Sequence, residues 1–248
     1  MSSTPFLPPL QDEPLLSSER LAGLDPRPLS AQRRFRSHHA IGGVAALLVS
    51  LPVFVQAPLV RYAPWVSLVM SLGWLGLSLH LYSQPRTRLW GDLLYGFTLT
   101  WLAGSLYWGW LRFEPLWHMP VEALGIPIVW WGTRRRFARI GTWFYLGSLW
   151  GTAVTDLYIH SVGLLPEWRQ AMQFDRLEQA VVPFRAALDK MATPWGLGWG
   201  IGLGLLLLGV GLWRVQGSRR LHHWAFAGAV LNTLLVDGLF GWGAALLR

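Results

Sequence analysis

Two pairs of histidine and carboxylate residues lie at helical spacing within apolar stretches of the sequence. His118 and Glu122 are four residues apart, and so are Asp156 and His160. Residues at positions i and i+4 share one helix face, so each pair presents an imidazole and a carboxylate together. Ionisable side chains within a membrane-spanning helix are costly and mark candidate functional sites. We expect Asp237, in a further apolar stretch, to complete an intramembrane polar cluster.

The residue types in this cluster suit several roles, and the sequence leaves them open. The carboxylates could form a structural network, or they could line a proton or ion path. His118 and His160 are candidate axial ligands of a chlorophyll magnesium, as are the tandem His222 and His223. Metal ligation fits poorly, because the spacing matches neither the zinc helix pattern nor the di-iron pattern. We therefore assign no metal ligand and no catalytic residue.

The elements that carry these residues are apolar stretches that approach the roughly 20 residues needed to cross a bilayer as a helix. Seven such stretches cover about residues 40–60, 63–82, 89–111, 115–131, 140–165, 195–213 and 223–247. Lipid offers the backbone no hydrogen-bond partner, and the stretches lack the two-residue alternation of barrel strands. We therefore predict an all-α, polytopic transmembrane helical bundle. Pro52 and Pro58 should kink or end the first helix.

Arginine placement predicts the orientation of this bundle. The N-terminal region and the loops at 83–88, 132–139 and 214–222 are all net positive, while the long loop at 166–193 is balanced. By the positive-inside rule, the N-terminus is cytoplasmic and all seven stretches span. The fourth stretch is short and contains Pro120 and Pro127 in its interior, but a re-entrant path there would turn the arginine cluster at 134–139 outward. The net charge of +8 thus orients the chain and does not indicate a nucleic-acid partner.

Composition supports a membrane protein with two regions outside the spans. Of the residues, 52% are hydrophobic and 14% charged, against about 25% charged in soluble domains. The absence of cysteine excludes disulfides and thiol catalysis. We expect residues 1–37 to be a disordered basic cytoplasmic tail without a signal peptide, and 38–248 to form the bundle. Apolar residues at three- and four-residue spacing predict an amphipathic segment on the outer side at about 166–193.

Glycine and tryptophan are abundant, with 27 and 17 residues. Gly196, Gly200 and Gly204 form a small-xxx-small face on the sixth stretch, which favours close packing with another helix or a partner. Many tryptophans lie at predicted helix ends, where aromatic belts form. Trp108 and Trp110 lie deeper, where they would fill the bundle or contact a partner or a flat pigment such as chlorophyll or a carotenoid.

Several strings of residues carry a family resemblance over about residues 40–247. They include Leu102-Ala103-Gly104-Ser105, Tyr107-Trp108-Gly109-Trp110, Glu114-Pro115-Leu116-Trp117-His118, Thr155-Asp156-Leu157-Tyr158 and Val236-Asp237-Gly238-Leu239-Phe240. These strings resemble a cyanobacterial integral membrane family of unknown function. The resemblance implies a thylakoid membrane and proteins found with early photosystem II assembly intermediates.

Two functional hypotheses follow from the sequence. The first is a non-enzymatic thylakoid protein that transiently binds a photosystem II reaction-centre subunit, an assembly intermediate or its pigments. The second is a small ion- or proton-coupled transporter that uses the intramembrane carboxylates. The absence of a paired repeat with broken helices in matching positions weighs against the second.

Overall fold

The computed structural model describes residues 27–174, 179–216, 218 and 220–245, and the side chains of most of these from residue 37 onward. Contacts divide the chain into two units, Met1–Arg36 and Ser37–Arg248. The backbone is helical from Arg27, where α2 begins within the expected tail. A proline at the second position suits a helix start, and no further proline follows until Pro52. The rest of the expected tail lies outside the described residues.

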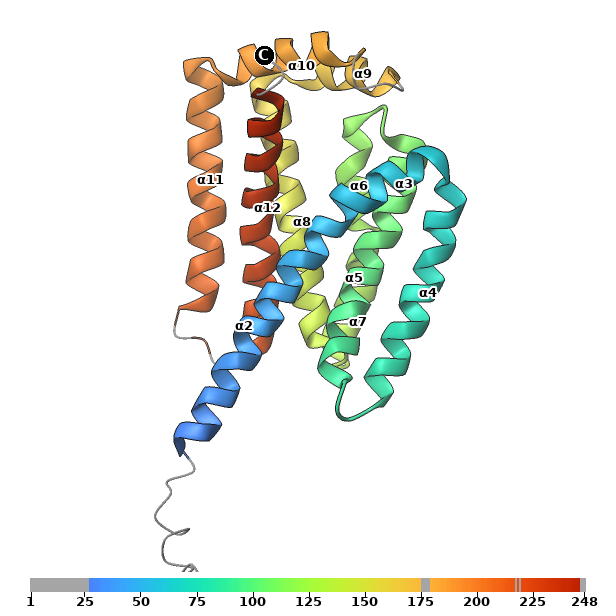
Figure 1. Ribbon diagram of the computed structural model, residues 1–248, viewed down its shortest axis with the longest axis vertical. Helices are drawn as coiled ribbons and strands as arrows, with labels where there is room; N and C mark the ends of the chain where they lie inside the picture. Colours follow the sequence, from blue (N-terminus) through green and yellow to red (C-terminus); the bar gives the residue numbers. More distant parts are fainter. Residues whose placement is uncertain (1–26, 175–178, 217, 219, 246–248) are drawn as a thin grey trace, which may run out of the picture. The chain divides into compact units, whose positions relative to one another are not determined.

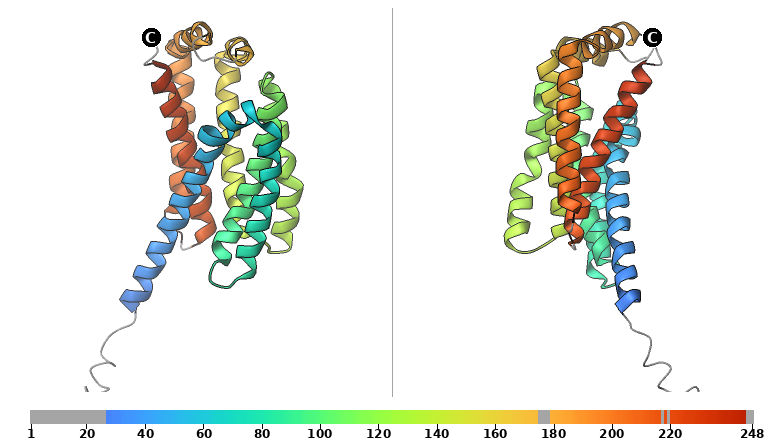
Figure 2. Two further views of the ribbon diagram at one scale, coloured as in Figure 1. Left: turned by 45° about the vertical axis from the view of Figure 1, so that its right-hand side comes forward. Right: turned by 90° about the vertical axis from the view of Figure 1, so that its left-hand side faces the viewer.

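The second unit is built from helices, and no strand occurs in the described ranges, which confirms the all-α prediction. Its long helices are α2 (Arg27–Leu51), α4 (Pro64–Ser83), α5 (Arg88–Leu106), α8 (Arg139–Val162), α11 (Pro194–Val215) and α12 (Leu221–Ala245). Helices α4, α5, α8, α12 and α11 lie side by side, and α8 packs against both α5 and α12 (Figure 1). The long helices joined by short loops, α4 with α5 and α11 with α12, run in opposite directions, as Figure 2 shows from two further sides.

Three helices among the described residues are long and apolar enough to cross a membrane: Ser37–Tyr62, Pro64–Ser83 and Pro194–Val215. The first of these contains a π-helical turn, Pro52–Gln56, followed by α3 (Ala57–Tyr62). The change of helix type at Pro52 is the expected kink, because proline cannot donate the hydrogen bond that an α-helix requires. Pro58 instead lies in the first turn of α3, where a proline is tolerated.

The fourth apolar stretch is a broken helix. It consists of two 3₁₀ turns, Pro115–Trp117 and Ala123–Gly125, and two helices, α6 (His118–Glu122) and α7 (Ile126–Arg134). At about 1.5 Å per residue, neither helix alone is long enough to cross a bilayer. The connection from α7 to α8 then uses left-handed backbone at Arg136 and Ala138. Because of these breaks, α6 begins at His118 and ends at Glu122.

The long loop forms two short helices, α9 (Leu165–Gln173) and α10 (Val181–Met191), which lie across one end of the long helices (top of Figure 1). A left-handed glycine, Gly163, ends α8 and directs the chain into α9. Lys190 Nζ lies 2.7 Å from a carboxylate oxygen of Glu167, which joins the two short helices. Of the apolar residues in the described part of 166–193, Trp168 and Met172 lie on α9, and Val181, Phe184 and Leu188 lie on α10.

The central core follows from the helical period. Leu93, Phe97 and Trp101 recur every four residues along α5 and are all but fully buried. This stripe meets Ile41 of α2 and Phe144 of α8 in one apolar cluster. The bundle thus encloses one face of α5. Polar groups near the C-terminal end of this face therefore lie inside the bundle.

Candidate functional site

The structure brings together one carboxylate and one imidazole from the two predicted pairs. His118 Nδ1 of α6 lies 2.9 Å from Asp156 Oδ1 of α8. The side chains are 17% and 10% exposed, so this contact is largely shielded from solvent. Because a carboxylate oxygen is an acceptor, the Nδ1–H group of His118 is the donor. The broken fourth stretch and the middle of the bundle are thus joined through two ionisable groups.

Glu122 and Tyr107 complete the surroundings of His118. Glu122 is buried, and it lies within electrostatic range of both His118 and Asp156. Tyr107, at the end of α5, stacks on the imidazole with ring centroids 4.2 Å apart. Its buried hydroxyl has no hydrogen-bond partner among the described residues. Tyr145 of α8 donates to the backbone carbonyl of Glu122, which holds the end of α6 against α8.

The other two members of the predicted cluster have different partners. His160 Nδ1 donates to the backbone carbonyl of Asp156, one turn earlier on the same helix, at 3.0 Å. Asp237 of α12 accepts a hydrogen bond from Thr155 Oγ1 at 2.7 Å. Thr155 precedes Asp156, so Asp237 lies beside the His118–Asp156 contact without a direct contact to either residue. The five predicted residues therefore form a neighbourhood centred on α8.

Both histidines have the ring arrangement common among ligating imidazoles. Each Nδ1–H donates to an oxygen, which leaves each Nε2 as an acceptor. A ligating histidine usually donates its second ring nitrogen to a carboxylate or carbonyl in this way. Across the described part of the chain, no group of three or more His, Asp or Glu residues is arranged to hold a metal ion.

A second ion pair lies at the end of the bundle, outside the apolar stretches. Arg169 of α9 binds Glu114 through two nitrogens, Nε at 3.1 Å and Nη2 at 2.9–3.0 Å. Hydrogen bonding to Arg169 holds the pKa of Glu114 below its ordinary value, although some burial opposes this. The Trp168 indole also donates to the carbonyl of Arg112 at 2.9 Å. These contacts thus hold α9 against the start of the broken fourth stretch.

The predicted glycine face of α11 lies at contacts within this chain. A Cβ on Gly196 would lie 2.5 Å from the carbonyl oxygen of Lys190. A Cβ on Gly200 would meet the Tyr158 ring, and one on Gly204 would meet Leu234. By contrast, the alternate glycines Gly198, Gly202 and Gly209 have nothing within 4 Å of such a Cβ.

The two tryptophans singled out in the sequence have different surroundings. Trp108 lies between the Tyr107 and Trp168 rings, with centroids 5.3 and 5.9 Å away. Trp110 is 40% exposed and makes an edge-to-face contact with Trp65. Trp108 therefore packs beside the polar cluster, whereas Trp110 is at the surface.

Sequence reasoning missed a buried polar network around Gln56. This residue is wholly buried in the π-helical turn, and its Nε2 contacts Ser105 Oγ at 2.8 Å and Ser67 Oγ at 3.2 Å. Ser67 and Ser105 also contact each other at 2.8 Å. A signal was present, because Gln56 is an amide within an apolar run.

The closest helix packing also lies at glycines that were not singled out. A Cβ on Gly96 of α5 would overlap the carbonyl oxygen of Gly141 on α8, and one on Gly228 of α12 would overlap that of Gly42. These glycines let two backbones touch directly. Asp92 accepts the Gly141 N–H at 2.7 Å and so ties α5 to the first turn of α8.

Comparison with known proteins identifies a family without an assigned activity. No curated protein and no solved structure matches the chain. A family model matches residues 45–245, which is most of the second unit and includes every residue of the polar cluster. The chain therefore belongs to the family described as a protein of unknown function, DUF3120.

Proposed function

We propose that this chain is a non-enzymatic, seven-pass membrane protein that binds another membrane protein through the outward face of α11. The observation that carries the proposal is the unfilled glycine face of that helix. Gly198, Gly202 and Gly209 have open space beside them, while the opposite glycines already pack within the chain. In lipid, helices associate by close packing over small residues, so an open small-residue face favours a partner helix.

Tryptophans at both ends of α11 support the same assignment. Trp195 and Trp213 are 62% and 66% exposed. They suit either interfacial anchoring or contact with a partner. The family resemblance of the sequence supports a photosynthetic setting, with a photosystem II reaction-centre or assembly-intermediate subunit in the thylakoid as the partner.

Pigment binding would accompany this role. His118 and His160 each keep Nε2 as an acceptor, so each would suit a chlorophyll magnesium. The test is the visible absorption spectrum of the protein purified from thylakoid membranes. A chlorophyll band that is lost in His118→Gln or His160→Gln is the expected result, and a colourless, folded protein would contradict this part of the proposal.

The partner is tested by purifying the tagged full chain in mild detergent and identifying co-purified reaction-centre subunits. A double variant, G198L/G202L, fills the open face of α11 and should abolish co-purification. G73L/G76L is the matched control, because these α4 glycines also have nothing within 4 Å. If the wild type recovers no such subunit, or if both double variants behave alike, the proposal is wrong.

The seven-pass topology with a cytoplasmic N-terminus is tested through the absence of native cysteine. Support comes from the alternating helix directions and from the arginine-rich loops at one end. Arg86→Cys should react with a membrane-impermeant maleimide only from the cytoplasmic side. Val182→Cys, at a residue 76% exposed on α10, should react only from the opposite side. Labelling of both from one side would contradict this topology.

A second candidate function is proton- or ion-coupled transport, which the buried His118–Asp156 contact and the adjacent Glu122 favour. Intramembrane acids that pair with histidine are found along proton paths. Reconstituted protein should then support a flux that Asp156→Asn and Glu122→Gln abolish without unfolding the chain. A wild-type protein that carries no flux excludes this candidate.

A further inference from the structure

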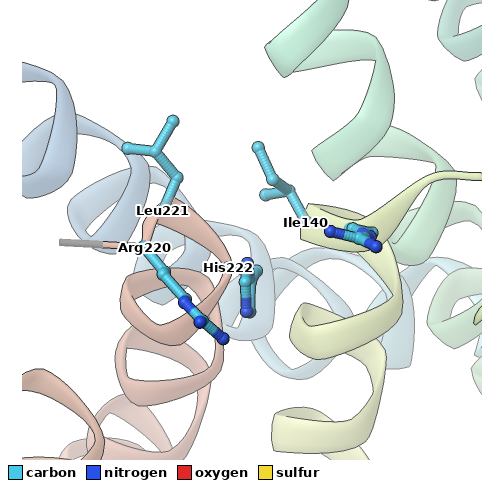
Figure 3. Close-up of a pocket in the computed structure, with 5 residues that line it drawn as sticks. Ile140, Arg220, Leu221 and His222 are labelled. Carbon is cyan, nitrogen blue, oxygen red and sulfur yellow. The ribbon is translucent and has the colours of Figure 1, made fainter. Parts of the chain in front are cut away.

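A pocket of about 550 Å³ lies where α8 and α12 begin, at the end of the bundle opposite α9 and α10. It is lined by Arg139 and Ile140 of α8, Arg220, and Leu221 and His222 of α12. Figure 3 shows Arg220 and His222 on one side and Ile140 across from them. The pocket therefore combines cationic side chains with two apolar ones.

The pocket carries positive charge, and no acid lines it. Arg139 and Arg220 are exposed, and neither takes part in an ion pair within the described part of the chain. His222 lies within electrostatic range of Arg139, Arg214 and Arg220. Asp92 accepts the Gly141 N–H from inside the bundle. An anion in the pocket would relieve the repulsion among these cations.

The backbone adds to this positive potential. Helix α8 begins at Arg139 and α12 begins at Leu221, and neither has an acidic residue in its first turn. The N-terminus of a helix carries a partial positive charge and unpaired N–H groups. Two long helices thus direct their positive ends toward one charged pocket.

The surroundings favour a lipid headgroup over a dissolved anion. Ile140 and Leu221 provide an apolar wall beside the arginines. Trp143 lies 5.4 Å from the His222 ring, and Arg214 lies over both Trp143 and the exposed Trp213. Tryptophan and arginine at one level are typical of the membrane interface. Basic pockets between helices at the cytoplasmic interface suit acidic lipid headgroups.

We infer that this pocket binds the anionic headgroup of a membrane phospholipid, with its phosphate between Arg139 and Arg220. The inference rests on α8 and α12 spanning the membrane as proposed, and it is independent of the partner of α11. The ligand would be held at the cytoplasmic end of the contact between α8 and α12.

The test uses the purified full chain and two lipids, phosphatidylglycerol and phosphatidylcholine. Retained lipid is counted by native mass spectrometry, and affinity is taken from the rise in melting temperature with added lipid. Each basic residue near a lipid surface contributes about fivefold, so R139Q/R220Q should weaken phosphatidylglycerol binding about 30-fold. The matched control is R86Q/R134Q, which removes the same charge from the same end of the bundle but outside the pocket.

Retention of phosphatidylglycerol over phosphatidylcholine, lost in R139Q/R220Q and kept in R86Q/R134Q, would support the site. Equal retention of the two lipids, or equal losses in the two double variants, would overturn it. Inorganic phosphate is added in a separate arm, and the same stabilisation at the same concentration would overturn the assignment to a lipid. Because the maleimide experiment reports topology separately, a failure of the pocket is distinguishable from a failure of the seven-pass arrangement.

Discussion

The contact between His118 and Asp156 offers a direct test of how much burial strengthens a charge-assisted hydrogen bond in this protein. It has a natural comparison in Glu114 and Arg169, because both pairs are 2.9 Å apart. The side chains of the first pair are 17% and 10% exposed, and those of the second are 42% and 35% exposed. Distance is thus held constant while solvent access differs.

The expected magnitude follows from this burial. Asp156→Asn keeps an oxygen that accepts from His118 Nδ1–H but removes the carboxylate charge that strengthens the hydrogen bond. Since a hydrogen bond to a charged group contributes about 1.5–3 kcal/mol and a neutral one about 0.5–1.5 kcal/mol, we expect Asp156→Asn to cost about 1.5 kcal/mol. His118→Gln should cost about 1 kcal/mol alone and add little in the Asp156→Asn background, which gives a coupling energy of about 1 kcal/mol. The more exposed Glu114–Arg169 pair should show a smaller coupling energy, of about 0.3 kcal/mol.

The assay is a double-mutant cycle for each pair, with the free energy of unfolding in detergent followed by tryptophan fluorescence. The variants of each cycle are Asp156→Asn with His118→Gln, and Glu114→Gln with Arg169→Gln. Equal coupling in the two cycles would refute the reasoning, because burial would then make no difference. Full additivity for His118 and Asp156 would show that their contact contributes nothing to the folded state.

Four further outcomes are expected from changes elsewhere in the chain. Gly96→Ala should lower the free energy of unfolding by about 1–3 kcal/mol, because its methyl group would meet backbone on α8. Gly198→Ala, with open space, should raise it by up to about 1 kcal/mol in the same unfolding assay. Because the pKa of Glu114 is lowered by Arg169, its stabilisation is complete above the unfolded value of about 4.3 and is lost as pH falls through the folded value. Melting curves at stepwise lower pH should therefore show a smaller acid-induced loss in Glu114→Gln than in the wild type. Gln56→Leu should change stability by less than about 1.5 kcal/mol, since Ser67 and Ser105 keep each other as partners; a larger loss on thermal unfolding would show that the amide is essential.

Much of the helical architecture was predictable because long apolar stretches have few alternatives. The sixth stretch, predicted at 195–213, is α11 at Pro194–Val215, where Thr193 caps the helix start. The fourth stretch shows the limit of this reasoning. Its interruption at Ala123–Gly125 depends on packing against α8, including the contact of Gly125 with the Tyr145 ring. Hydropathy carries no information about such a contact.

The candidate site was predictable in its residues and only partly in its contacts. Spacing of four residues placed a histidine and a carboxylate on each of two helices, and the structure joins His118 to Asp156 across them. The same spacing did not predict that His160 would donate a hydrogen bond to a backbone carbonyl of its own helix. For Gln56, an amide within an apolar run pointed to a buried polar contact, but its partner Ser105 lies 49 residues later in the chain and could not be named from the run itself.

The direct backbone contact between Gly96 and Gly141 has a consequence for the biosynthesis of the protein. Helices α5 and α8 are separated in the sequence by the broken fourth stretch, which must leave the ribosome before α8 does. Close packing at these glycines can therefore form only after α6 and α7 have been made. During translation, the small-residue face of α5 remains exposed to lipid or to insertion machinery until α8 arrives. Cross-linking of stalled nascent chains through a residue near Gly96 should detect lipid or insertion machinery beside α5 in short chains, and α8 beside it in longer ones.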